Sequence, residues 1–196
     1  MCKFSEDSRQ KLGNAVIYIA NHTEQLSKTK LLKLLFLMEE YMVKRYHVPF
    51  MGLPFEIWQA GPVAKDIFID LSDGPSLLKD FVKTEVQKDA TYIRAIKPFC
   101  DDEFSDCEME MMDEIIRKYG KKTAKQLVAE VHKEGSLWFN AAKKHGLLTA
   151  FNKGLCNNSD YTIDFSEELS DCAREDYKES LAIHQTANIL KAQGHV

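Results

Sequence analysis

Long apolar stretches and paired cysteines are both missing from this chain of 196 residues. No apolar run approaches ~18 residues, which is the length that a membrane-crossing helix needs, so we expect no transmembrane span. The five cysteines are an odd number and none are spaced Cys-x-x-Cys. Met1–Phe4 shows no leader pattern. We therefore expect free thiols and a location in the reducing cytoplasm.

The motifs of common catalytic and cofactor sites are also missing. The six histidines form no His-Glu-x-x-His pattern, and no Cys/His pair has the spacing of a structural zinc site. The chain contains neither a glycine-rich phosphate-binding loop nor a Gly-x-Ser-x-Gly nucleophile elbow. We therefore expect no catalytic residue, no bound cofactor and no metal.

What the chain does contain is an ordinary globular composition. Hydrophobic residues make up 44% of it and charged residues 29%, which argues against disorder. The formal net charge is -4 and the isoelectric point is near 5.9, so nucleic acid is an unlikely partner. The length suits one domain, or one domain with an appendage. We expect a helical domain over residues 1–150 and, over residues 151–196, an extension that packs on or beside it.

Two helices are predicted in the first quarter of the chain. Apolar residues recur at helical spacing from about Ser8 to His22. A second helix is predicted from Lys28 to Tyr46 with Ser27 as its N-cap, and it is apolar on so many sides that we expect it to be central. Four basic residues form the rim of this helix that is expected to be exposed to solvent: Lys30, Lys33, Lys44 and Arg45.

The most distinctive segment follows this helix. Pro54–Val63 reads Pro-Phe-Glu-Ile-Trp-Gln-Ala-Gly-Pro-Val. Alternation over Phe55–Trp58 predicts a short strand. Because Pro is well tolerated in a first helical turn, we expect Gly61-Pro62 to end the strand and to start a helix that reaches Leu71. Residues 77–86 are predicted as a short helix or a loop, and residues 92–99 as a weak strand that could pair with Phe55–Trp58.

Helices dominate the second half. Capping boxes at Ser105–Glu108 and Thr123–Gln126 each predict a helix start, and Ser136 is predicted to cap a third helix. Eight acids and no bases occupy residues 101–114, which suits either a solvated helix start or a face that docks a basic partner. A strand at residues 161–165 and a final helix within residues 166–190 complete the expectation. The predicted fold class is α+β and predominantly helical, a helical core with a small antiparallel sheet or hairpin.

The order of these parts resembles the Panacea domain family, also called SocA-like or GepA-like, of bacterial and phage antitoxin-associated proteins. The resemblance covers about residues 12–145 and rests on four runs: Lys30-Leu-Leu-Lys-Leu-Leu-Phe-Leu37, the decapeptide Pro54–Val63, Leu127-Val-Ala-Glu-Val-His132 and Ser136-Leu-Trp138. It implies a mostly helical α+β domain that neutralises a cognate toxin protein encoded beside it.

Three functions follow as hypotheses. The first is an antitoxin-like protein that binds its toxin directly, and the second is a proteolytic adaptor that delivers a partner to a protease. The third is a thiol- or His-dependent enzyme. Six motif residues are candidates for partner binding, unless they only hold the core: Glu56, Trp58, Gly61, Pro62, His132 and Trp138. The sequence leaves the oligomeric state open.

Overall fold

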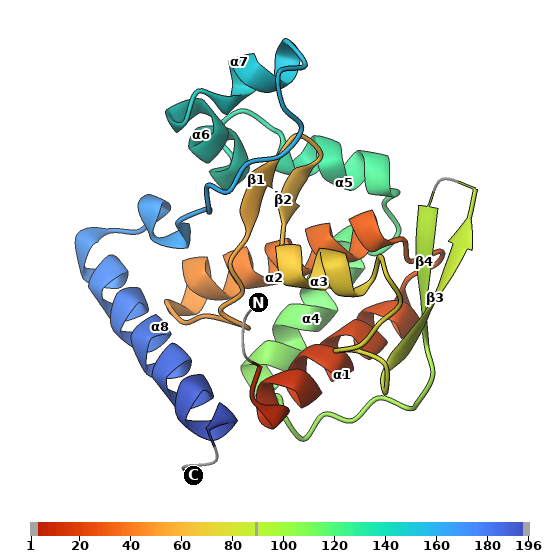
Figure 1. Cartoon of the computed structure of the whole chain (residues 1–196). Coiled ribbons are helices and arrows are strands. Elements are labelled where there is room, and N and C mark those ends of the chain that lie inside the picture. The colour runs from red at the N-terminus through yellow and green to blue at the C-terminus, as the bar shows by residue number, and fades with distance from the viewer. Residues whose placement is uncertain (1–3, 89, 194–196) are drawn as a thin grey trace.

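A computed structural model describes residues 4–88 and 90–193 of the chain. Eight α-helices and two separate two-stranded antiparallel sheets make up the described residues (Figure 1). The prediction of a predominantly helical α+β fold is confirmed. None of the described helices is long and apolar enough to cross a membrane.

Both N-terminal helices begin at serine caps. Helix α1 spans Glu6–His22 and starts two residues earlier than predicted, because the Ser5 side chain accepts a hydrogen bond from the Ser8 amide. Helix α2 spans Lys28–Tyr46 with Ser27 as its cap, as predicted. Most of α2 is buried, and the other elements surround it in Figure 1. The expectation of a central helix is confirmed.

The predicted solvent-exposed rim of α2 is wrong for two of its four residues. Lys44 and Arg45 are exposed, but Lys30 and Lys33 are buried. Each buried ammonium group donates to backbone oxygen, that of Lys30 to Gly120 at 2.6 Å and that of Lys33 to Pro62 at 2.8 Å. Their methylene stems can pack among apolar side chains while these carbonyls satisfy the charged heads.

The decapeptide forms a hairpin. Strand β1 (Glu56–Trp58) pairs antiparallel with strand β2 (Gly61–Val63), so the prediction that Gly61-Pro62 starts a helix is wrong. The third helix, α3, begins later and spans Lys65–Asp70. Gly61 has a φ of +95°, which a helix start does not adopt, and this backbone angle closes the tight turn between the two strands.

The second sheet is a hairpin of its own. Strand β3 (Val82–Gln87) pairs with strand β4 (Ala90–Ala95), and neither pairs with β1. The suggested pairing with Phe55–Trp58 is therefore wrong, as is the expectation of only helix or loop at residues 77–86. The outer strand of this hairpin is β3, because the Ile93 amide of β4 donates to the carbonyl oxygen of Leu26 at 2.8 Å.

Short helices follow from α4 to α7, and their bounds are Asp106–Tyr119, Ala124–Val131, Leu137–Lys144 and Leu147–Asn152. Both predicted capping boxes are present, and Ser136 caps α6. The buried stripe of α4 includes Met111, Met112 and Ile115, whereas Met109 and Ile116 are half-buried. Adjacent apolar residues allow two helical stripes, and periodicity alone does not choose between them.

The last part of the chain returns to the hairpin and then leaves it. Instead of a strand over residues 161–165, Thr162 forms a single bridge to Glu56 of β1. A 3₁₀ turn, η1 (Phe165–Glu168), follows, and helix α8 spans Asp171–Ala192. Figure 1 shows α8 along the opposite side of the molecule from the β3–β4 hairpin.

Candidate functional site

The six motif residues gather where the β1–β2 hairpin meets α2, the end of α5 and the start of α6. A buried lysine of α2 contacts the Gly61-Pro62 pair among them. Lys33 is 1% exposed, and its ammonium nitrogen lies 2.8 Å from the carbonyl oxygen of Pro62. Burial lowers the pKa of Lys33 to about 7. The sequence analysis had assigned this side chain to the solvent.

Gly61 is required by the same contact. A Cβ atom at this position would lie 2.6 Å from Cε of Lys33 and 3.0 Å from Cγ2 of Val131. The positive φ of Gly61 adds a second reason, because side chains other than glycine are strained there. The Gly61-Pro62 pair is therefore fixed by its packing against α2 and α5.

His132 and Trp138 stack on each other. Their ring centroids are 3.8 Å apart and their planes differ by 9°. The indole nitrogen of Trp138 donates to the carbonyl oxygen of Trp58 at 3.1 Å, which ties α6 to the hairpin. Desolvation first, and then the nearby charge of Lys33, lower the pKa of His132 to about 4, so the ring is neutral at pH 7. Within the described residues Nε2 of His132 has no hydrogen-bond partner.

Glu56 and Trp58 form the half-buried outer part of the group. The indole nitrogen of Trp58 donates to Oε2 of Glu56 at 2.8 Å, and the Trp58 ring meets Phe68 edge-on with centroids 5.0 Å apart. Lys65 lies 3.2 Å from Oε1 of Glu56, while its hydrogen bonds to Asp160 and then to Glu56 raise the pKa of Lys65. These side chains line the edge of the hairpin, where a partner can reach them.

A second buried charge on α2 was also missed by the sequence analysis. The Glu39 carboxylate accepts hydrogen bonds from the backbone amides of Phe50, Met51 and Gly52 at 2.9 to 3.2 Å. Burial raises the pKa of Glu39 to about 7 against the opposite effect of these amides. An acid inside an otherwise apolar helical run was the only signal in the sequence. Glu39 fixes the loop that leads from α2 into the decapeptide.

The contacts of this cluster are those of a structural junction. Lys33 and His132 line none of the three cavities found among the described residues. No group of three or more His, Cys, Asp or Glu residues in the described part of the chain could hold a metal ion. Cys100, Cys107 and Cys172 are exposed free thiols, and Cys156 is half-buried. Cys2 lies outside the described residues.

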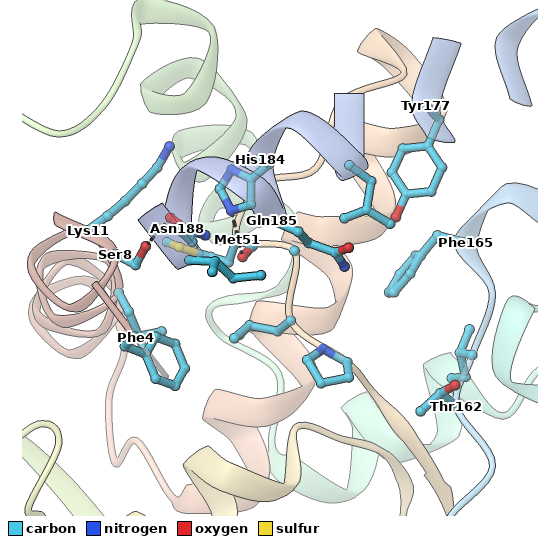
Figure 2. A pocket seen from close by; sticks show the side chains of 17 residues that line it. Phe4, Ser8, Lys11, Met51, Thr162, Phe165, Tyr177, His184, Gln185 and Asn188 are labelled. Carbon is cyan, nitrogen blue, oxygen red and sulfur yellow. Dashed lines mark hydrogen bonds between the residues drawn. The ribbon is translucent and has the colours of Figure 1, made fainter. Parts of the chain in front are cut away.

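Two adjoining cavities lie on the α8 side of the hairpin. The first, of about 460 Å³, is bounded by α1, α8 and the segments 51–54 and 162–165 (Figure 2). The second, of about 1120 Å³, lies against α3 and the start of β1 and is lined by Glu56 and Lys65. Four residues line both cavities, namely Phe4, Leu53, Pro54 and Thr162. The space at the hairpin edge therefore adjoins the space beneath α8.

The predicted acidic surface is partly used inside the molecule. Glu108 is buried, where it closes the capping box with Ser105 and lies 2.6 Å from the Lys11 ammonium. Asp113 and Glu114 accept hydrogen bonds from the hydroxyls of Tyr18 and Tyr41. Other acids of residues 101–110 are exposed, as a solvated helix start requires.

Comparison with known proteins gives one family. A family model described as "Antitoxin SocA-like, Panacea domain" matches residues 31–139, which is more than half of the chain. No curated protein and no solved structure matches the chain. The matched span extends from α2 into α6, and it contains Lys33 and all six motif residues.

Proposed function

The chain belongs to the antitoxin SocA-like, Panacea domain family, and from this premise we propose that it neutralises a cognate toxin protein by binding it directly. Family membership supports an antitoxin-type role with a protein partner. We add two points to it: that the chain contacts its toxin directly, and that the toxin is encoded beside the gene. The single observation that carries it is the match over residues 31–139.

The arrangement of the motif residues is compatible with this role. Gly61, Pro62 and His132 are packed into the junction, whereas Glu56 and Trp58 are half-buried at its edge. A binding protein needs a stiff scaffold and an accessible rim, because ordering flexible groups on association costs affinity. We assign Glu56 and Trp58 to the accessible rim and the other motif residues to the scaffold.

A second candidate is the adaptor role, and the observation that favours it is the exposed apolar surface of α8. This helix lies outside the matched span, and its Ile183 is 63% exposed. The proposed division at residue 150 makes the C-terminal segment a second contact surface. An adaptor truncated after residue 150 would still bind its partner but would no longer promote the partner's degradation.

The enzyme hypothesis has the least support. The lowered pKa of His132 keeps its ring neutral at pH 7. The ring is stacked on Trp138. A general base must reach the proton that it abstracts, and the ring of His132 lines none of the three cavities described above.

The test is co-expression with the adjacent open reading frame. We expect the neighbouring protein to arrest growth when it is produced alone and the full chain to relieve the arrest. Gly61→Asp, which disrupts the scaffold, should abolish relief, whereas Gly135→Asp, at a turn with free space around it, should retain it. A harmless neighbour, or arrest that the wild-type chain does not relieve, would contradict the proposal.

A further inference from the structure

We propose that the two adjoining cavities form one docking groove, here called the α8 groove, which receives an apolar segment of a protein partner with basic residues beside it. The α8 groove comprises the residues that line either cavity on the face between α3 and α8. The identity of the partner as a toxin rests on the proposed function, whereas the chemistry of the segment rests on the groove itself.

The groove is of useful size. Phe4, Leu53, Pro54 and Thr162 line both halves, so the cavity of about 460 Å³ adjoins that of about 1120 Å³ along these four residues. Sites that bury small ligands are typically 300–1,000 Å³. The combined space therefore exceeds that of one small ligand, and it runs from the motif edge at Glu56 to the middle of α8.

Large apolar side chains are exposed along this groove. Ile69 of α3 is 48% exposed and lines the larger cavity, and Ile189 of α8 is 56% exposed and lines the smaller one. Leu53 and Pro54 line both cavities. A continuous apolar surface rimmed by polar residues is typical of sites that bind other proteins.

One donor that opens into the groove has no acceptor among the described residues. Tyr177 of α8 is only 5% exposed, and its hydroxyl makes no hydrogen bond among the described residues. Figure 2 shows this hydroxyl directed into the cavity on the side of Phe165 and Gln185. Burial, and then the charges of Glu39 and Asp164, raise the pKa of Tyr177, so the group remains a donor. A backbone carbonyl oxygen of a bound segment would satisfy it.

The remaining polar groups argue against a small polar ligand. The Ser8 hydroxyl donates to Oδ1 of Asn188 at 2.6 Å, and a ring nitrogen of His184 lies 3.2 Å from the carbonyl oxygen of Met51. These groups are occupied by each other. Recognition of a polar metabolite needs several converging polar groups, and among Ser8, Asn188, His184 and Tyr177 the Tyr177 hydroxyl alone makes no hydrogen bond within the described residues. An apolar chain with one carbonyl group therefore fits better.

The charge of the groove determines which charged residues a partner segment should carry beside its apolar residues. In the larger cavity the charge of Glu56 is offset by Lys65 at 3.2 Å. Asp70 accepts hydrogen bonds from neutral donors, the amides of residues 76–78 and the Ser76 hydroxyl, so these bonds leave its negative charge in place. In the smaller cavity the Lys11 charge is compensated by Glu108 at 2.6 Å. The groove is thus negative at its α3 end, and a partner segment with Lys or Arg next to its apolar residues is favoured there.

The experiment uses the full chain and two probes. One is a random-sequence peptide library displayed on phage, and the other is the purified protein encoded by the neighbouring gene. The groove variants are Ile69→Asp, Ile189→Asp and Tyr177→Phe. Ile183→Asp is the matched control, because Ile183 is an exposed isoleucine of the same helix that lines neither cavity. Circular dichroism and urea unfolding verify that each variant is folded.

We expect the selected peptides to combine apolar residues with Lys or Arg. Each groove Asp variant should weaken their binding about tenfold or more, and Tyr177→Phe by less, while Ile183→Asp leaves it unchanged. Failure to enrich any peptide, or equal binding by groove and control variants, would overturn the groove. If the neighbouring protein does not bind but the peptides behave as expected, the proposed toxin partner fails and the groove stands. If the neighbouring protein binds all variants equally and the peptides do too, only the groove fails.

Discussion

Two junctions of the molecule attach outer elements to the α1–α2 core in opposite ways. At the junction of α2 with the β1–β2 hairpin, Lys33 donates a buried hydrogen bond to the Pro62 carbonyl oxygen and Trp138 a part-buried one to that of Trp58. At the junction of α8 with α1 and the loop after α2, two side-chain pairs and one contact of His184 with the Met51 carbonyl oxygen lie around a cavity, and none of them is fully buried. Of the α8 residues only Ala173 and Tyr177 are buried.

The two kinds of contact give the two junctions different rigidity. Buried polar groups with a single satisfied arrangement fix geometry, because breaking them leaves an unpaired group in a low dielectric. Pairs on a half-exposed helix are worth little each, so α8 can yield locally without loss of the fold. The family motifs therefore hold the scaffold, and the space beneath α8 is left for a partner.

Lys33 should give the largest effect. Its pKa is about 7 in the folded chain and about 10.4 when unfolded, so between these values only the unfolded chain holds the proton. Raising the pH through this window removes the proton from the unfolded chain and so raises the free energy of unfolding, by on the order of 3–5 kcal/mol in total. Lys33→Met should lack this rise. Urea unfolding from pH 7 to pH 10 measures both proteins, and parallel curves would contradict the buried ammonium group.

Gly61→Ala should come next. The new methyl group meets Lys33 and Val131, and the positive φ is strained, so the free energy of unfolding should fall by about 3 kcal/mol. Gly135→Ala is the control, since Gly135 has a similar φ of +85° and no atom within 4 Å of its Cβ position. It should cost about 1 kcal/mol. Equal losses in chemical denaturation would show that the hairpin does not pack tightly on α2.

Trp138→Phe should have an intermediate effect. It removes the donor to the Trp58 carbonyl oxygen and part of the stack with His132, at a cost of about 2 kcal/mol. It should also raise the pKa of His132 from about 4, because a smaller ring leaves the imidazole more solvated. NMR titration of the His132 ring checks this, and an unchanged pKa would be evidence against the stack as the source of its burial.

Asn188→Ala should have the smallest effect on the fold. It removes the bond with Ser8 between α8 and α1 and should lower the free energy of unfolding by less than about 1 kcal/mol. Amide hydrogen exchange in α8 should nevertheless accelerate, while exchange in α2 stays the same. If α2 accelerates equally, then α8 unfolds only with the whole molecule and the two junctions do not differ.

The sequence predicted those features that depend on neighbouring residues. Helix α2, its Ser27 cap and the two capping boxes are local patterns, and they appear as expected. In the second hairpin the pattern indicated only a weak strand at residues 92–99, which overlaps β4, and it missed β3, because β3 is defined by its pairing with β4. Gly61-Pro62 fits both a strand end and a helix start, and only its contacts with α2 and α5 decide between them.

The candidate site was predicted as a set of residues and not as an arrangement. The six motif residues do lie together, but Lys33, which contacts the Gly61-Pro62 pair among them, was assigned to the solvent. Its acceptor is a carbonyl oxygen 29 residues further along the chain, and no periodicity predicts such a contact. The α8 groove was beyond prediction for the same reason, since α1, α3, α8 and the segment at Thr162 meet only in three dimensions.

The most direct test of a rigid motif junction and a partner-binding α8 groove is amide hydrogen exchange of the full chain with and without the protein encoded by the neighbouring gene. The account predicts new protection in α8, α3 and the segments 51–54 and 162–165, with little change in α2 or in the β3–β4 hairpin. Protection confined to the β3–β4 hairpin or to the acidic start of α4, with α8 unaffected, would contradict it.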